Sequence, residues 1–111
     1  MKGLIIKPKW ADLILDGWKV MELRGSNTNI RGTIGIIKSG TKKVYGTVDL
    51  VDCVKLDETN YYRMISNHQY KEKFEDIPYT NLYGWVLSNP VRYKEPIPYN
   101  HKLGCVIWVN I

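Results

Sequence analysis

Several features that define common protein classes are missing from this chain of 111 residues. It has only two cysteines, Cys53 and Cys105, which are too few for a disulfide-stapled domain. Both lie in apolar, strand-like runs, where buried reduced thiols are common, so we expect a cytoplasmic location. No apolar run approaches the roughly 18 residues that cross a bilayer. The opening segment is interrupted by Lys7 and Pro8, which excludes a signal peptide there.

The motifs of cofactor-dependent and metal-dependent enzymes are also missing. There is no phosphate-binding loop, no dinucleotide-binding glycine pattern and no HExxH sequence. The two histidines, His68 and His101, lie in polar, loop-like stretches without cysteines or carboxylates at the spacing of a zinc site. We therefore expect no metal site and no cofactor.

Acidic side chains are scarce in the first half of the chain. The net charge of the whole sequence is +5, but residues 1–47 carry 9 Lys and Arg against 3 Asp and Glu, a net charge of +6. Residues 48–111 carry 7 basic and 8 acidic side chains, a net charge of −1. This asymmetry indicates an anionic partner, for which nucleic acid is the usual candidate. The alternative is a solvated surface whose charge only aids solubility.

Local patterns in the first half of the chain predict short strands around one helix. An apolar strand over residues 4–6 leads to a helix that starts at Pro8, a favoured first position, and ends at Gly17. Alternation over residues 20–24 predicts a strand with Met21 and Leu23 on one face and Glu22 and Arg24 on the other. Further strands are expected over residues 32–38 and 44–54, joined by a turn over 39–43.

The second half of the chain is harder to interpret. Residues 57–80 are rich in Tyr, Lys, Glu and Asn, and we expect one or two short helices that cover a barrel end. A strand is predicted over residues 84–87, and the prolines that follow confine residues 91–93 to a separate short strand. Residues 104–111 are apolar on both faces, which predicts a central closing strand. We therefore predict one α+β domain over residues 1–111, a small barrel of about six mostly antiparallel strands.

A local cluster of charged side chains is the strongest candidate for a site. Glu22 and Arg24 share a strand face, and Lys7, Lys19 and Ser39 complete the cluster, with Arg31 and Lys38 as further cations. A carboxylate beside cations orients their side chains, and such a group can bind phosphate or accept a hydrogen bond from the amine of a base. The alternative is an exposed ion pair of about 0–1 kcal/mol without a functional role.

Aromatic side chains are the second notable feature, with 4 Trp, 8 Tyr and 1 Phe. We expect Trp85 and Trp108 in the core and Trp10 on the inner face of its helix. Trp18 follows the glycine that ends the helix and is harder to bury, while Tyr83 lies at a junction between loop and strand. An exposed ring beside a basic groove can stack on a base, worth roughly 1–3 kcal/mol. The alternative is that the tyrosines fill the core and rim of the barrel.

One family resemblance runs nearly from end to end and is weakest over residues 57–80. Gly17, Lys19, Glu22 and Arg24 match in register the G-x-K-x-x-E-x-R motif of the ASCH domain (activating signal cointegrator homology). The chain resembles small bacterial or phage-type single-domain members in four further stretches, which are Gly3–Ala11, Asn27–Gly32, Gly46–Asp52 and Val106–Trp108. The resemblance implies a PUA-like pseudo-barrel.

The resemblance also implies a function and a site. PUA-like domains are associated with RNA, and related folds bind modified bases. The ligand cleft implied by the resemblance lies beside the motif and the first strand–helix junction, which places Lys7, Lys19, Glu22 and Arg24 in or near it, with Ser39 as a neighbour. The partner expected on this basis is nucleic acid, single-stranded RNA above all, or a modified nucleoside.

Three functions follow as hypotheses. The first is an RNA-associated module that holds a base in a basic cleft. The second is a hydrolase, because one branch of the family deacetylates N4-acetylcytidine and resembles this chain in Lys19. That branch has a threonine where this chain has Glu22, together with a separate glutamate from its helical region. In this chain Glu22 would act as general base on water, with Lys19 as electrostatic stabiliser. Ribonuclease activity, also attributed to some members, would use Glu22 as base and Lys19 or Arg24 to stabilise the phosphorane. The third is a protein-interaction domain of the transcription-coregulator type that uses residues 57–80.

Overall fold

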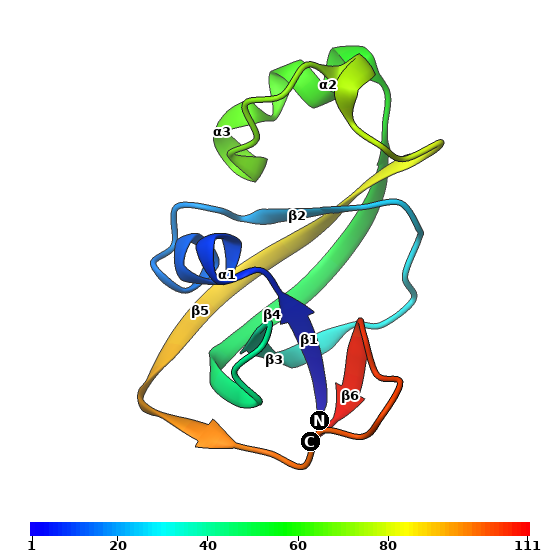
Figure 1. Cartoon of the computed structure of the whole chain (residues 1–111). Helices are drawn as coiled ribbons and strands as arrows, with labels where there is room; N and C mark the ends of the chain where they lie inside the picture. Colours follow the sequence, from blue (N-terminus) through cyan, green and yellow to red (C-terminus); the bar gives the residue numbers. More distant parts are fainter.

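A computed structural model describes the whole chain, residues 1–111. Its six strands form one sheet in the order β2-β5-β4-β3-β1-β6, and short helices gather at one end and on one side (Figure 1). Only β1 and β3 run parallel to each other, so the α+β class and the mostly antiparallel pairing are confirmed. The strands are β1 (Lys2–Ile6), β2 (Met21–Arg24), β3 (Gly32–Lys38), β4 (Lys43–Leu56), β5 (Leu82–Pro98) and β6 (Trp108–Asn110). The helices are α1 (Pro8–Leu15), α2 (Glu58–Arg63), α3 (Ile65–His68) and the 3-10 helix η1 (Phe74–Asp76).

The first strand and helix form where their local signals predict them. Pro8 occupies the first helical position of α1, where its missing N–H leaves no hydrogen bond unmade. Asp16 caps the other end, and Gly17 at φ +86° turns the chain towards β2, a conformation that favours glycine. Ile14 and Leu15 are buried against the sheet. This turn leads to Lys19 and to β2, which pairs with β5 and whose Arg24 side chain reaches the carbonyl oxygen of Ile5 in β1.

The long pair β4–β5 contains the first correction to the predicted strands. β5 continues through Pro90 and Pro96 for 17 residues, so these prolines do not confine residues 91–93 to a separate strand. Pro90 lies between Ser88 and Val91, where the register against β4 shifts, and Pro96 lies within a second shift. A proline is tolerated at a bulge because no ladder N–H is required there.

The end of the chain contains the second correction. β6 covers only Trp108–Asn110 and lies at the sheet edge beside β1, whereas a long central strand over residues 104–111 was predicted. Val106 is exposed, and Gly104 at φ +90° belongs to an irregular segment before the strand. A short apolar run does not reveal by itself whether its side chains face a core or a surface. Trp108 does contact the core, where its ring stacks on Trp85 with centroids 5.7 Å apart.

β2 separates an apolar core from a polar face. Met21 and Leu23 are buried in a cluster with Tyr61 and other side chains of the helical segment, residues 57–80. Glu22 and Arg24 point the other way, so the predicted alternation is confirmed.

The helical segment covers one end of the sheet above β2 and α1, as expected (Figure 1). None of the helices is both long enough and apolar enough to span a bilayer.

Candidate functional site

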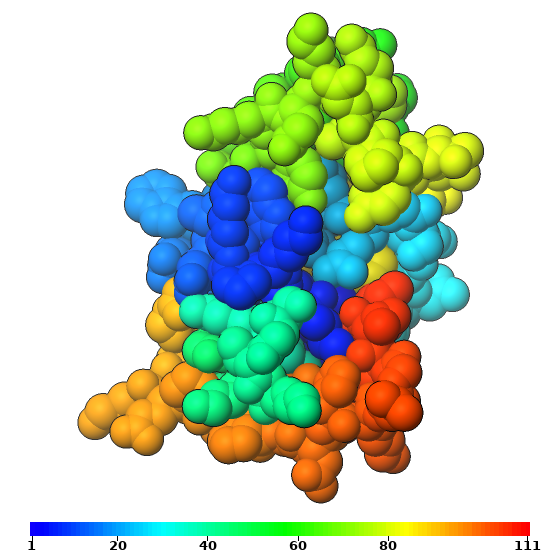
Figure 2. Space-filling model, in the orientation of Figure 1, coloured from blue at the N-terminus to red at the C-terminus, as the bar shows by residue number.

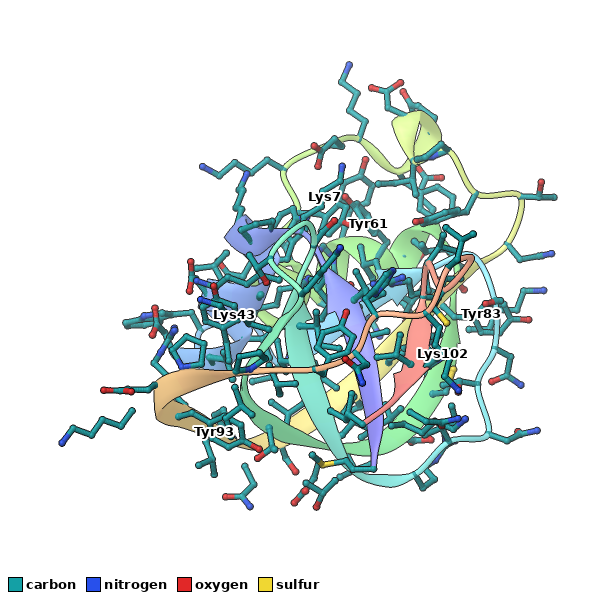
Figure 3. All side chains as sticks on the ribbon, turned by 60° about the horizontal axis from the view of Figure 1, so that its bottom comes forward. Lys7, Lys43, Tyr61, Tyr83, Tyr93 and Lys102 are labelled. Atoms are coloured by element: carbon teal, nitrogen blue, oxygen red, sulfur yellow. The ribbon has the colours of Figure 1, made fainter.

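A cleft of about 260 Å³ opens where β1 and β3 end. The two strands are parallel, so their carboxyl ends meet at one edge of the sheet, and the backbone N–H of Ser39 donates to the carbonyl oxygen of Ile6 at 2.8 Å. Lys7 therefore follows β1 (Figure 3) and Ser39 follows β3 at the same place. The cleft is lined by Ile5, Ile6, Lys7, Trp10, Glu22, Leu23, Arg24, Ser39, Tyr70, Tyr79 and Val106.

Segments that are distant in sequence meet around this cleft. Figure 2 shows the face on which α1 (blue), the turn over residues 39–43 (green-cyan) and the segment over residues 100–107 (orange-red) meet. The helical segment (green) lies directly above α1 in this view. The site is therefore built by tertiary contacts and not by one loop.

Arg24 holds one oxygen of the Glu22 carboxylate in place. Its Nε and Nη2 donate to Oε2 of Glu22 at 3.1 and 2.9 Å, and Nη2 also donates to the carbonyl oxygen of Ile5 at 3.1 Å. Charge-assisted bonds of this kind are short and strong, and they fix both side chains against β1. The guanidinium also lies 5.7 Å from the ring centroid of Trp85.

The second carboxylate oxygen of Glu22 has no such partner. Glu22 is 3 % exposed, and its buried Oε1 accepts no hydrogen bond from the protein. Lys19 Nζ lies 3.6 Å from it, beyond hydrogen-bond distance. A buried acceptor without a donor costs about 1–3 kcal/mol, so native proteins rarely keep one without a reason. Oε1 of Glu22 is therefore a buried acceptor without a donor, on a residue that lines the cleft.

Lys19 lies behind the cleft and not on its lining. It is 1 % exposed, and its Nζ donates to the carbonyl oxygen of His68 at 2.6 Å. The same nitrogen lies 4.7 Å and 4.9 Å from the ring centroids of Trp10 and Tyr70. Burial lowers the pKa of Lys19 from 10.5 to about 8, although the nearby Glu22 carboxylate opposes this shift. Lys19 therefore packs behind the cleft lining, against the Glu22 carboxylate and the rings of Trp10 and Tyr70.

Two of these aromatic rings form a wall of the cleft. Trp10 and Tyr70 stack with centroids 4.5 Å apart and planes 4° from parallel. Burial raises the pKa of the Tyr70 hydroxyl, and the Glu22 carboxylate raises it further, so this ring stays neutral well above physiological pH. Each ring covers one face of the other, and both side chains line the cleft.

His68 was expected in a polar loop, and that interpretation was wrong. The side chain is fully buried at the end of α3. Its Nδ1 accepts from the backbone N–H of Tyr70 at 3.0 Å, and its Nε2 lies 2.9 Å from the carbonyl oxygen of Tyr61. Both contacts are satisfied only by a neutral ring with the proton on Nε2. Burial lowers the pKa of His68, which favours the same neutral ring. His68 thus positions Tyr70 through its ring and Lys19 through its carbonyl group.

Other candidate residues lie away from the cleft. Lys38 pairs with Asp12 at 2.8 Å, and Arg31 donates to the carbonyl oxygen of Thr28 at 2.9 Å. Neither is among the residues that line the cleft, so two of the basic residues expected in the cluster serve elsewhere. Trp18 is 69 % exposed, as expected of a ring that is hard to bury, but it also lies outside the cleft.

Comparisons with known proteins agree with this architecture. The family model described as "ASCH domain" matches residues 4–97. This chain belongs to the ASCH family. The ASCH protein of Zymomonas mobilis has a similar crystal structure, with a TM-score of 0.70 and 23 % sequence identity over 87 % of this chain and 72 % of that one. A tyrosine-to-phenylalanine variant of the same protein gives the same score and covers 74 % of its chain. No curated protein matches.

Membership confirms the PUA-like fold, and ASCH domains are in general associated with RNA. The structure also explains the physical role of each motif residue in this ASCH domain. Gly17 provides the left-handed turn, Lys19 is the buried cation, and Glu22 and Arg24 form the ion pair on the cleft face of β2. The four motif residues thus lie in one short segment, in which the turn at Gly17 precedes the three charged side chains.

Tyr70 and Tyr79 are cleft residues that sequence reasoning missed. Both come from the helical segment, residues 57–80. The only available signal was the density of tyrosine there, which equally predicts a core role. The segment brings no carboxylate to the cleft, and the Glu72 carboxylate accepts a hydrogen bond from the backbone N–H of Lys71 outside it.

Proposed function

We propose that this ASCH domain binds single-stranded RNA by holding one base, unmodified or modified, in the cleft at the ends of β1 and β3. The observation that carries the proposal is the unbonded Oε1 of Glu22 at a site lined by Trp10 and Tyr70. A base that displaces the side chains covering this oxygen would donate to it from an exocyclic amine or a ring N–H. The base would gain a charge-assisted hydrogen bond, and the protein would lose a buried acceptor without a donor.

The cations around the cleft support the same proposal. Lys7 and Arg24 line it, and the Glu22 carboxylate is the only acidic side chain on the lining. A base bound by Glu22 brings a negatively charged backbone, which Lys7 at the exposed junction of β1 and α1 would meet. The cleft therefore combines one acceptor for a base with cations for a phosphate.

Binding is tested by fluorescence anisotropy with short, labelled single-stranded RNA. We expect Glu22→Gln to weaken binding by at least about tenfold, because the loss of a hydrogen bond to a charged group is worth roughly 1.5–3 kcal/mol. Lys7→Ala should weaken binding less. It should also reduce the slope of log affinity against log salt concentration by about one. Circular dichroism would establish that each variant is folded.

The matched control is Lys55→Ala, which removes an exposed positive charge on β4 outside the cleft. It should change neither the affinity nor the salt dependence appreciably. Equal losses in Lys7→Ala and Lys55→Ala would indicate diffuse attraction and would contradict a specific cleft. If wild-type protein binds neither RNA nor nucleosides, the remaining hypothesis is a protein partner at residues 57–80.

Hydrolysis is the second candidate function. It is favoured by the free Oε1 of Glu22, which can take a proton from an attacking water, and by Lys19, whose pKa of about 8 keeps a cation nearby at neutral pH. We expect slow or absent turnover, since the helical segment supplies no second carboxylate to the cleft. Chromatography of N4-acetylcytidine and RNA incubated with the wild-type and Glu22→Gln proteins decides the matter. Product formation that disappears in the variant would favour the enzyme.

A further inference from the structure

A second cavity of about 300 Å³ adjoins the cleft. The two cavities share Ile5, Ser39 and Val106, so these side chains form a low partition between two parts of one groove. The second cavity continues over the turn that follows β3 and under the segment before β6, which includes Lys102 (Figure 3). The groove is therefore longer than one base requires.

The walls of the second cavity are held in position by their own contacts. The backbone N–H of Tyr99 donates to the carbonyl oxygen of Lys42 at 3.2 Å, which joins one wall to the other. Thr41 Oγ1 donates to the carbonyl oxygen of Lys38 at 2.7 Å and braces the turn. Gly40 at φ +84° adds no side chain to the cavity floor. These bonds make the cavity a formed feature of the fold.

The chemistry of the second cavity repeats that of the first. Its lining includes the exposed cation Lys42 and two rings, Tyr99 and His101, whose Oη and Nδ1 atoms lie 2.9 Å apart. It contains no carboxylate. Each cavity thus offers an aromatic surface and a cation, the two features that single-stranded nucleic acid requires of a protein.

We propose that the second cavity binds the nucleotide next to the base held by Glu22, with Tyr99 as its stacking surface and Lys42 as its phosphate contact. This inference rests on the proposed function of the first cleft. It specifies the ligand as a single-stranded polynucleotide, because a free nucleoside fills only the first cavity. The linking phosphate would pass over the Ser39 partition, between Lys7 and Lys42.

The test compares two sizes of ligand by isothermal titration calorimetry. The probes are the four ribonucleosides and the four dinucleoside monophosphates made of two identical nucleosides. We expect the best dinucleoside monophosphate to bind at least about tenfold more tightly than its nucleoside, since stacking of one more base contributes roughly 1–3 kcal/mol. Equal affinities of the two ligands would overturn the inference and leave the proposed function intact.

Variants test whether the higher affinity of the dinucleoside monophosphate, the gain, comes from the second cavity. Lys42→Asn removes the charge while keeping a residue that tolerates φ +56°, and Tyr99→Phe keeps the stacking ring. We expect Lys42→Asn to abolish most of the gain for the dinucleoside monophosphate and to leave nucleoside affinity unchanged. Tyr99→Phe should keep the gain, and Tyr99→Ala, if folded, should lose it. The control Lys94→Ala, an exposed cation outside both cavities, should behave as wild type.

The outcomes separate the two claims. Dinucleoside binding that is tighter but insensitive to Lys42→Asn and Tyr99→Ala would overturn the second site alone. Nucleoside binding that is insensitive to Glu22→Gln would contradict the proposed function of the first cleft. If neither ligand size binds, both claims are wrong.

Discussion

Glu22 lies between two cations, and each is nearest to a different oxygen of its carboxylate. Arg24 binds Oε2 through two nitrogens, while Lys19 remains 3.6 Å from Oε1 and donates to the carbonyl oxygen of His68 instead. The carboxylate is therefore held in one orientation, although its Oε1 atom accepts no hydrogen bond. A buried ion pair of this kind contributes little to stability by itself, because desolvation offsets most of the attraction. Stability alone therefore gives no reason for this pair, whereas the proposed binding of a base would give one.

Lys19 should make stability depend on alkaline pH. Its pKa falls from 10.5 unfolded to about 8 folded, so between these values the unfolded chain binds more protons. The free energy of unfolding should then rise with pH, by up to about 1.4 kcal/mol per pH unit. From about pH 7 to about pH 9.5, wild type should gain roughly 2 kcal/mol relative to Lys19→Met. Urea denaturation of both proteins measures this, and parallel pH profiles would contradict it.

His68 should make stability depend on mildly acidic pH. Burial lowers its pKa below 6.5, so in acid the unfolded chain takes up a proton that the folded ring resists. Stability should therefore fall as the pH drops below about 6.5, because protonated Nδ1 cannot accept from the Tyr70 N–H. The same denaturation experiment on His68→Gln should give a flatter acid limb. An unchanged limb would show that other groups control acid unfolding.

The elements with local signals were those that the sequence predicted well. Pro8 and Gly17 mark the ends of the first helix region, and the alternation over Met21–Arg24 is enough to assign the two faces of β2. The predictions for β5 and β6 were wrong because the extents of these strands depend on which strand lies beside them. Bulges opposite β4, for example, absorb Pro90 and Pro96. Pairing across the sheet is a long-range property that local patterns do not contain.

Gly46 of β4 lies against the backbone of β5 with no room for a side chain. A Cβ there would overlap the carbonyl oxygen of Val91 and contact the Leu15 side chain. Because the obstacle is backbone, we expect Gly46→Ala to destabilise the protein by about 1–3 kcal/mol or more through displacement of β5. Thermal denaturation measures the effect, and Ser88→Ala on the exposed part of β5 is the control. A stability equal to wild type would mean that the two strands separate easily.

The candidate site depends on the whole molecule. Four of the five residues chosen from the sequence line one cleft, namely Lys7, Glu22, Arg24 and Ser39. Two of them follow β1 and β3 and two belong to β2, and the fold brings these strands together there. Tyr70 and Val106 join them from distant segments whose positions no local pattern reveals. The charge excess of residues 1–47 does not identify the residues of the cleft, because Lys38 and Arg31 make their contacts elsewhere.

The measurement that tests the central claim most directly is an NMR titration of the ¹⁵N-labelled protein with short single-stranded RNA. The four tryptophan indole N–H groups report on different parts of the molecule, and Trp10 lies in the cleft while the exposed Trp18 does not. We predict that the Trp10 resonance shifts together with the backbone of Glu22, Arg24 and Tyr70, and that Trp18 stays unchanged. Shifts at Trp18, with Trp10 unmoved, would contradict a base-binding cleft.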